Sequence, residues 1–241
     1  MNVLTVAMAR DEEALIPYFV RYYMELGDVT LFDDNSTDDT ASAARAEGAT
    51  VLPVEGQQEE HMEHRIVRAK DHAWKPVRNN YDWVIAVDVD EFLYHKDGLA
   101  DALYRCHEQG ATVLQPIGYE MVSDAFPSGP AHITAQVRRG VPEALYSKQC
   151  CFDPRRITDI NYGIGAHHAN PEGTVRVVAY QGLKLLHYRF LGHEWIANRF
   201  ANRRRWQAKY DTPEGWCTYS ETPGQLRDII AELDAKATEV I

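Results

Sequence analysis

Two aspartates follow a hydrophobic run near the middle of the chain. The segment VIAVDVDEFLY at 84–94 places Asp88 and Asp90 two residues apart, directly after four apolar residues. Side chains two apart on an extended chain share a face, so both carboxylates are expected to point at one small region. Carboxylates held that close raise each other's pKa unless a cation neutralises them. A hard divalent ion could do this and bridge two phosphates of a substrate; the alternative is a solvated strand end that caps the next helix.

A second acidic cluster, DDNSTDD at 33–39, follows another apolar run. Asp34 and Asn35 could belong to a ligand site or form only an Asx turn. Strand and helix patterns alternate along the first half, which predicts βαβ units and a mostly parallel sheet flanked by helices. Ligands bind beyond the carboxyl ends of such strands, so both clusters are expected on one rim. The expected strands lie at 3–9, 28–34, 50–54, 81–88 and 111–118, and the expected helices at 11–27, 38–48, 61–77 and 97–110.

The second half of the chain is less regular. An apolar run, GLKLLHY, is expected to form a strand that ends at His187, and helical patterns return at 194–210 and 223–237. Pro17, inside the first helical pattern, is expected to kink that helix or delay its start. We expect one continuous α/β domain with two halves, residues 1–118 and residues 119–241.

Composition excludes several classes of protein. The chain has 241 residues and a net charge of −11, which disfavours binding to nucleic acid. No stretch approaches the roughly 20 apolar residues that span a bilayer, and no basic leader precedes the first apolar run, so we expect neither a transmembrane segment nor export. Its four cysteines, Cys106, Cys150, Cys151 and Cys217, have no CxxC spacing, so neither a zinc ribbon nor a disulfide framework is predicted, and a cytoplasmic location is expected.

Three segments together resemble the glycosyltransferases of the GT-A fold, in the family 2-like and family 92-like group. They are VAMARDEEALIPYFVRYYMELGDVTLFDDNSTDDT, DWVIAVDVDEFL and LKLLHYRFLGHEWIANRF. The resemblance covers the first 100 residues and the segment 183–209. It implies a GT-A, Rossmann-like sheet, a nucleotide-sugar-binding half at 1–118 and an acceptor-side half at 119–241.

The resemblance also implies a donor site. Asp88 and Asp90 would hold the ribose and a Mn²⁺ or Mg²⁺ ion, with Asp90 the firmer metal ligand and His187 completing the metal site; a core histidine is the alternative for His187. Asp33 and Asp34 would face the base and ribose of the donor, and Ala9 and Arg10 would line the same pocket. Arg65 matches a basic position that fixes the donor, although it could equally lie on a solvated helix face.

The implied enzyme is a hexosyltransferase that moves a sugar from a nucleotide-diphosphate sugar to a hydroxyl of a glycan or another acceptor. A UDP-sugar is the first candidate donor. Relatives invert the sugar, which requires a base for the hydroxyl proton. Glu120 and Asp124 are the candidate bases by chain order, although either acid could only cap a loop. Four further residues could belong either to the site or to the surface. Lys148 and Arg155 could bind diphosphate oxygens, and His167 and His168 could lie at the acceptor site. For the run Arg203–Arg205, a solvated helix face is favoured.

Two other classes of protein are weighed against this interpretation. In a phosphohydrolase of the haloacid dehalogenase type, Asp88 would attack phosphate and Asp90 would act as acid. That class expects threonine or valine at the position of Phe92 and this strand near the chain start, and neither expectation is met. A carbohydrate- or nucleotide-binding module without catalysis is the other class, and the lack of a clear base is its only support.

Overall fold

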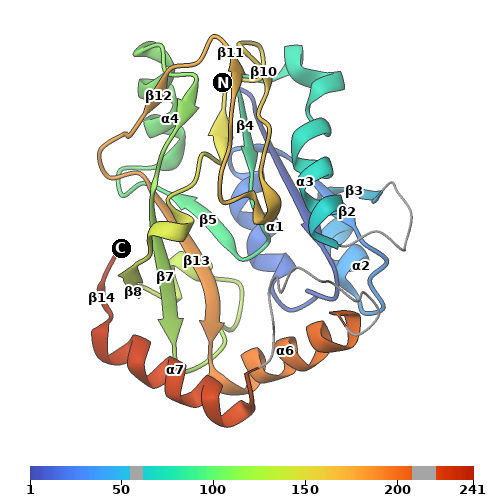
Figure 1. The fold of residues 1–241 in the computed structure, drawn as a ribbon, viewed down its shortest axis with the longest axis vertical. Coiled ribbons are helices and arrows are strands. Elements are labelled where there is room, and N and C mark those ends of the chain that lie inside the picture. The colour runs from blue at the N-terminus through green and yellow to red at the C-terminus, as the bar shows by residue number, and fades with distance from the viewer. Residues whose placement is uncertain (55–61, 208–220) are drawn as a thin grey trace.

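The computed structural model describes residues 1–54, 62–207 and 221–241, which form a mixed α/β fold (Figure 1). Its main sheet has seven strands in the order β12-β6-β9-β4-β1-β2-β3, and only the pairs that β9 makes are antiparallel. The predicted mostly parallel sheet is therefore confirmed. Its strands are β1 (Val3–Ala9), β2 (Gly27–Asp33), β3 (Thr50–Pro53), β4 (Trp83–Ala86), β6 (Val113–Leu114), β9 (Cys151–Phe152) and β12 (Val177–Val178).

The inner strands of the main sheet are buried on both faces, and every residue of β1 and β4 is buried. Along β1, Val3 and Ala7 belong to one apolar cluster and Leu4 and Val6 to another, as the alternation of a strand requires. The first cluster includes residues of several helices, among them α1, α2 and α4, and the second includes Trp74, which lies between helix α3 and the 3₁₀ helix η1. These elements are α1 (Ile16–Met24), α2 (Thr40–Ala46), α4 (Leu99–Glu108), α3 (Met62–His72) and η1 (Lys75–Asn80).

A second sheet of five strands packs beside the first, in the order β14-β8-β7-β13-β5. Strand β13 lies between β5, with which it is antiparallel, and β7, with which it is parallel. This register pairs His187 with Glu91 on one side and with Glu120 on the other. The strands are β5 (Glu91–Tyr94), β7 (Ile117–Ser123), β8 (Arg139–Pro142), β13 (Lys184–Leu191) and β14 (Thr238–Glu239).

The bounds of several expected strands differ in the structure. The run expected as one strand at 111–118 divides into β6 and the start of β7, which lie in different sheets. The residues after β4 also cross to the second sheet, as β5. The strand expected to end at His187 continues to Leu191, so His187 lies inside β13.

The second half of the chain contributes strands to both sheets and two long helices. Helices α6 (His193–Gln207) and α7 (Pro223–Lys236) run along one end of the molecule (Figure 1). They confirm the predicted helices, except that 208–210, like Cys217, lie outside the described residues. The shorter elements are α5 (Ile133–Gln136), η2 (Ala144–Tyr146), β10 (Ile157–Asp159), η3 (Ile164–Ala166) and β11 (Glu172–Gly173).

The first helix starts later than the pattern at 11–27 suggests. Helix α1 begins at Ile16, with Pro17 in its first turn, where a missing N–H costs nothing. The preceding residues therefore form a loop, in which Glu12 is buried. Within the described ranges, none of the helices is long and apolar enough to cross a membrane.

Candidate functional site

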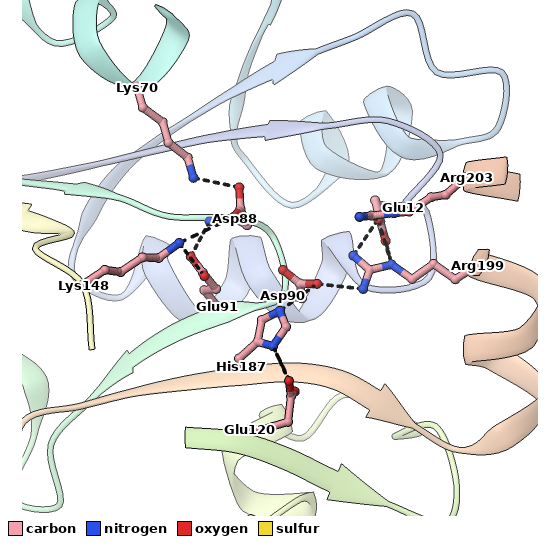
Figure 2. A network of polar contacts seen from close by, with 10 residues as sticks. All are labelled: Glu12, Lys70, Asp88, Asp90, Glu91, Glu120, Lys148, His187, Arg199 and Arg203. Atoms are coloured by element: carbon pink, nitrogen blue, oxygen red, sulfur yellow. Dashed lines mark hydrogen bonds and ion pairs between the residues drawn. The ribbon is translucent and has the colours of Figure 1, made fainter. Parts of the chain in front are cut away.

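The turn between β4 and β5 carries the two aspartates and directs them at different cations (Figure 2). Asp88 and Asp90 lie outside both strands, and the turn is closed where Glu91 N donates to Asp88 O over 3.0 Å. Their side chains therefore do not follow the alternation of a strand, and the expectation that both point the same way is wrong. Each carboxylate is neutralised by its own set of protein side chains.

Asp88 lies between two buried lysines. Lys70 Nζ, on α3, is 2.7 Å from Asp88 Oδ1, and Lys148 Nζ is 3.7 Å from Asp88 Oδ2. Lys148 also lies 2.6 Å from Glu91 Oε1, and both of these side chains are almost fully buried. Burial opposes ionisation of Asp88, but the charges of Lys70 and Lys148 outweigh it and lower its pKa to about 2.

Asp90 is held between a histidine and an arginine. Arg199 Nη1 donates to Asp90 Oδ2 over 2.7 Å, and His187 Nε2 lies 3.5 Å from the same oxygen. The other ring nitrogen of His187 is 2.9 Å from Glu120 Oε1, and Tyr146 stacks on the ring with centroids 3.9 Å apart. Burial disfavours the charged ring, but Glu120 and Asp90 outweigh it and raise the pKa of His187 to about 10.

Glu12 connects this turn to the loops after β1 and β2. Arg199 donates from Nε and Nη2 to the Glu12 carboxylate, and Arg203 Nη2 donates to Glu12 Oε1 over 2.7 Å. The backbone N–H of Glu12 donates to Thr40 Oγ1, at the start of α2. The carboxyl ends of β1, β2 and β4 thus share one network of polar contacts, as expected for the rim of a parallel sheet.

A second group of charges surrounds Asp34. Its carboxylate is fully buried, 2.9 Å from Arg65 Nη2 and 3.3 Å from Arg10 Nη1, and its backbone N–H donates to Ala9 O. Within the described part of the chain, Asp34 Oδ1 has no hydrogen-bond partner. A buried carboxylate oxygen without a donor is costly, so this oxygen suits a ligand that offers an N–H or O–H. Asp33 is half-buried, and its Oδ1 accepts from Ser36 N over a long 3.4 Å.

The structure thus brings together most of the residues expected at the donor site. Asp88, Asp90, Lys148, His187 and Glu120 meet around the turn after β4. The second group consists of Ala9, Arg10, Asp34 and Arg65, with Asp33 beside it.

The two candidate bases are placed differently. Glu120 is buried with both oxygens on His187 Nδ1, which makes it a positioning residue for the ring. Asp124 is exposed beyond the end of β7, four residues and so about 13 Å along the strand from Glu120. Neither geometry is that of a base free to take a proton within this network.

The remaining open positions divide between site and surface. Arg155 pairs with Asp82 and Asp153, away from this network, and His168 is exposed. His167 is half-buried, and its ring lies near Tyr146. In the run 203–205, the expected solvated face is wrong for Arg203, which contacts Glu12.

Four charged residues of the network were not among the sequence candidates: Glu12, Lys70, Glu91 and Arg199. The pattern at 11–27 places Glu12 in the first turn of a helix, because nothing local shows that the helix begins after it, at Ile16. Arg199 lies within the segment 183–209 that carries the resemblance, which was the one signal available for it. Lys70 follows Arg65 on the same helix, and its complete burial is a tertiary property.

The donor atoms near Asp90 fit a divalent ion held by few protein ligands. Among the described residues, no three His, Cys, Asp or Glu side chains converge as a complete metal cage. Asp90 and His187 offer one oxygen and one nitrogen 3.5 Å apart, and Glu120 contacts the other ring nitrogen of His187, as carboxylates that orient a metal-binding histidine do. Mg²⁺ in particular binds through one or two carboxylates together with substrate phosphates and water. Asp88 is less available as a metal ligand than Asp90, because Lys70 and Lys148 lie against its carboxylate.

Comparisons with known proteins show a partial likeness. No family model matches the chain, and no curated protein matches it. Among solved structures, glucosyl-3-phosphoglycerate synthase from Mycobacterium tuberculosis in complex with phosphoglyceric acid is 19% identical, with a TM-score of 0.35 over 48% of this chain and 44% of that one. The same enzyme with Mn²⁺, uridine diphosphate and glucosyl-3-phosphoglycerate gives a TM-score of 0.32 at 19% identity over the same shares of both chains. A structure described as a mycobacterial protein gives 0.36 at 19% identity, over 49% of this chain and 41% of that one.

The likeness is therefore limited in extent. The chain spans less than half the length of these proteins. These sequence identities and TM-scores do not identify a family for the chain.

Proposed function

We propose that the chain is a metal-dependent glycosyltransferase of the hexosyltransferase class. It moves a sugar from a nucleotide-diphosphate sugar to a hydroxyl of a glycan or another acceptor, and a UDP-sugar is the first candidate donor. The observation that carries the proposal is the Asp90–His187–Glu120 arrangement, with its second carboxylate Asp88, at the carboxyl end of a buried parallel strand. The resemblance of the segments that carry these residues supplies the reaction.

The proposal gives each group of charges a part in donor binding. Asp90 and His187 hold Mn²⁺ or Mg²⁺, and Glu120 keeps the His187 ring in place. The bound ion would supply Lewis-acid stabilisation of the departing diphosphate. Lys70 and Lys148 hold Asp88 in a fixed orientation toward the ribose. Asp34, with Arg10, Arg65 and the neighbouring Asp33, faces the base.

The acceptor side of the reaction carries a narrower proposal. We assign residues 119–241 to the acceptor and 1–118 to the donor, although both halves contribute strands to both sheets. An inverting displacement needs a base, and Glu120 is committed to His187. Asp124 is the remaining candidate, provided that the acceptor brings its hydroxyl to the end of β7. A change of anomeric configuration between donor and product, read by NMR, is the expected outcome.

A thermal-shift screen of nucleotides and nucleotide sugars, with and without Mn²⁺, tests the donor proposal. A ligand at about 100 times its Kd stabilises the folded state by about 2.7 kcal/mol, which should raise Tm by about 5–10 °C in a chain of this size. We expect UDP and a UDP-sugar to give this shift only with the metal present. Equal shifts with and without Mn²⁺, or none for any nucleotide, would contradict the metal-linked donor site.

The Asp34→Asn variant tests the assignment of the base pocket. The amide keeps the size of the side chain but removes the charge and one acceptor from the buried position between Arg10 and Arg65. We expect UDP binding to weaken by about 1–3 kcal/mol, the usual cost of an unpaired buried partner, measured by calorimetry with Mn²⁺ present. Asp33→Asn is the matched control and should have a smaller effect, because Asp33 is half-buried and makes one long hydrogen bond. Unchanged UDP affinity in Asp34→Asn would return this loop to a structural role.

Two measurements separate the proposal from its alternatives. Trapping of a covalent aspartyl-phosphate on Asp88 would establish a phosphohydrolase, although Lys70 and Lys148 lie on opposite oxygens of that carboxylate. Binding of a UDP-sugar with no release of UDP, tested over a panel of glycan acceptors, would favour a binding module.

A further inference from the structure

Asp90 already has a tightly held cation in the metal-free protein. Arg199 Nη1 lies 2.7 Å from Asp90 Oδ2, closer than His187 Nε2 at 3.5 Å. All three side chains are more than nine-tenths buried, so water screens these charges little. The oxygen that a divalent ion would share with His187 is therefore the one that Arg199 occupies.

Arg199 is anchored independently of Asp90. Its Nε and Nη2 both donate to the Glu12 carboxylate, at 2.9 and 2.7 Å, so only Nη1 is directed at Asp90 (Figure 2). The guanidinium also lies over the Trp195 ring, 5.0 Å from its centroid, one turn earlier on α6. Arg199 can thus lose the contact with Asp90 and remain paired with Glu12.

A guanidinium and a divalent ion at one carboxylate oxygen exclude each other in part. Both draw on the same negative charge, and they repel each other across a site with little water. A buried carboxylate that loses a cation is also less stable, and in the metal-free protein Arg199 makes a shorter contact with Asp90 Oδ2 than His187 does. The two cations are alternatives at Asp90.

We propose that Arg199 is a resident counter-ion of Asp90 that competes with the divalent ion and so sets the affinity of the site for metal. The proposal rests on the metal site of the proposed function. It gives α6 a role in that site, through a residue whose contacts reach both Glu12 and Asp90. A purely positioning role for Arg199, in which it holds Oδ2 and turns Oδ1 toward the ion, predicts the opposite sign.

The test is whether loss of Arg199 strengthens or weakens Mn²⁺ binding. Binding is measured with Mn²⁺ alone on the full, metal-stripped chain, from the electron paramagnetic resonance signal of free Mn²⁺ at fixed ionic strength. Replacing the charge with a side chain of similar length, Arg199→Met, is expected to tighten Mn²⁺ binding at least about 10-fold, within the range that neighbours of metal ligands exert. The metal-free Tm of this variant should fall and should recover when Mn²⁺ saturates the site, because Asp90 then regains a cation. Unchanged or weaker Mn²⁺ binding would overturn the proposal.

Three further variants show where the gain arises. Arg203→Gln removes one positive charge from the same helix at a residue that contacts Glu12, and it should change Mn²⁺ affinity by less than about threefold. Asp90→Asn added to Arg199→Met should abolish the gain. Glu12→Gln added to Arg199→Met should keep it, since this pair leaves no unpaired Glu12 to attract Mn²⁺. If Arg199→Met alone is too unstable to measure, this double variant serves as the folded protein in which Mn²⁺ binding is compared. Any of three results would overturn the proposal. Arg203→Gln could tighten Mn²⁺ binding as much as Arg199→Met does, the gain could persist when Asp90→Asn is added, or it could be lost when Glu12→Gln is added.

The failure of this proposal is distinguishable from the failure of the proposed function. Mn²⁺ binding that depends on Asp90 but is not tightened by Arg199→Met would overturn the counter-ion role alone. Mn²⁺ binding that none of the variants alters would overturn the metal site at Asp90 and the counter-ion role with it.

Discussion

The Asp90→Asn variant is expected to lose Mn²⁺-linked nucleotide binding and sugar transfer. Asparagine keeps the shape of the side chain but removes the charge that faces His187 and Arg199. Loss of a group that only orients a metal ligand already costs metal sites about 10–100-fold in affinity, so loss of this ligand should weaken UDP binding in the presence of Mn²⁺ by at least about 100-fold, measured by calorimetry. Binding without metal should change little.

The matched control for the binding part of this prediction is Asp124→Asn. It makes the same acid-to-amide change at an exposed position beyond β7 and should leave the affinity for Mn²⁺ and UDP unaltered. Circular dichroism would establish that Asp90→Asn still folds. A variant that folds and binds UDP with Mn²⁺ as tightly as the parent would remove Asp90 from the metal site.

The largest effect on stability is expected from Lys148→Met. Lys148 and Glu91 form an ion pair in which each side chain is 1% exposed, so methionine leaves a buried carboxylate without its cation. Breaking such a pair costs about 3–5 kcal/mol of the free energy of unfolding, which urea denaturation would measure. Glu91 cannot easily turn to water, because Oε2 also accepts from Asp88 N in the turn.

Two comparisons show whether the unpaired charge is the cause. The double variant Lys148→Met with Glu91→Gln removes both charges and should recover much of the loss, as buried pairs replaced by neutral groups often do. Lys75→Met breaks the partly exposed pair between Lys75 and Asp159 and should cost less than about 1 kcal/mol. A loss of under about 1 kcal/mol in Lys148→Met itself would mean that Glu91 finds another partner.

The order of elements and the position of the rim could be predicted because they follow from local patterns. Alternating strands and helices, apolar runs and their acidic ends were sufficient to place Asp34, Asp88 and Asp90 at the carboxyl ends of strands. The change of sheet after β4 could not be predicted, since the acids at 88–91 mark the end of a strand but do not show which sheet the following residues join. That change determines where each carboxylate points.

The cations of the site were missed for a related reason. Arg199 and Arg203 lie on a helix rich in arginine and asparagine, whose few apolar residues include the buried Ile196 and Phe200, so the pattern does not show which arginines face inward. Their burial depends on Glu12, which is close in space but 187 positions from Arg199. Glu12 in turn is free to reach them only because α1 begins after it, at Ile16. No window of sequence contains these facts together.

The span of the Glu12–Arg199 contact has a consequence for synthesis of the chain. The ribosome adds about 5–20 residues per second, so many seconds separate the appearance of Glu12 from that of Arg199. During this interval the parallel sheet can begin to form from its early strands, while Glu12 and Asp90 still lack the arginine that neutralises them. The contacts of Arg199 with Glu12 and Asp90 can form only after α6 has emerged, so completion of this part of the candidate site belongs to the last stage of folding.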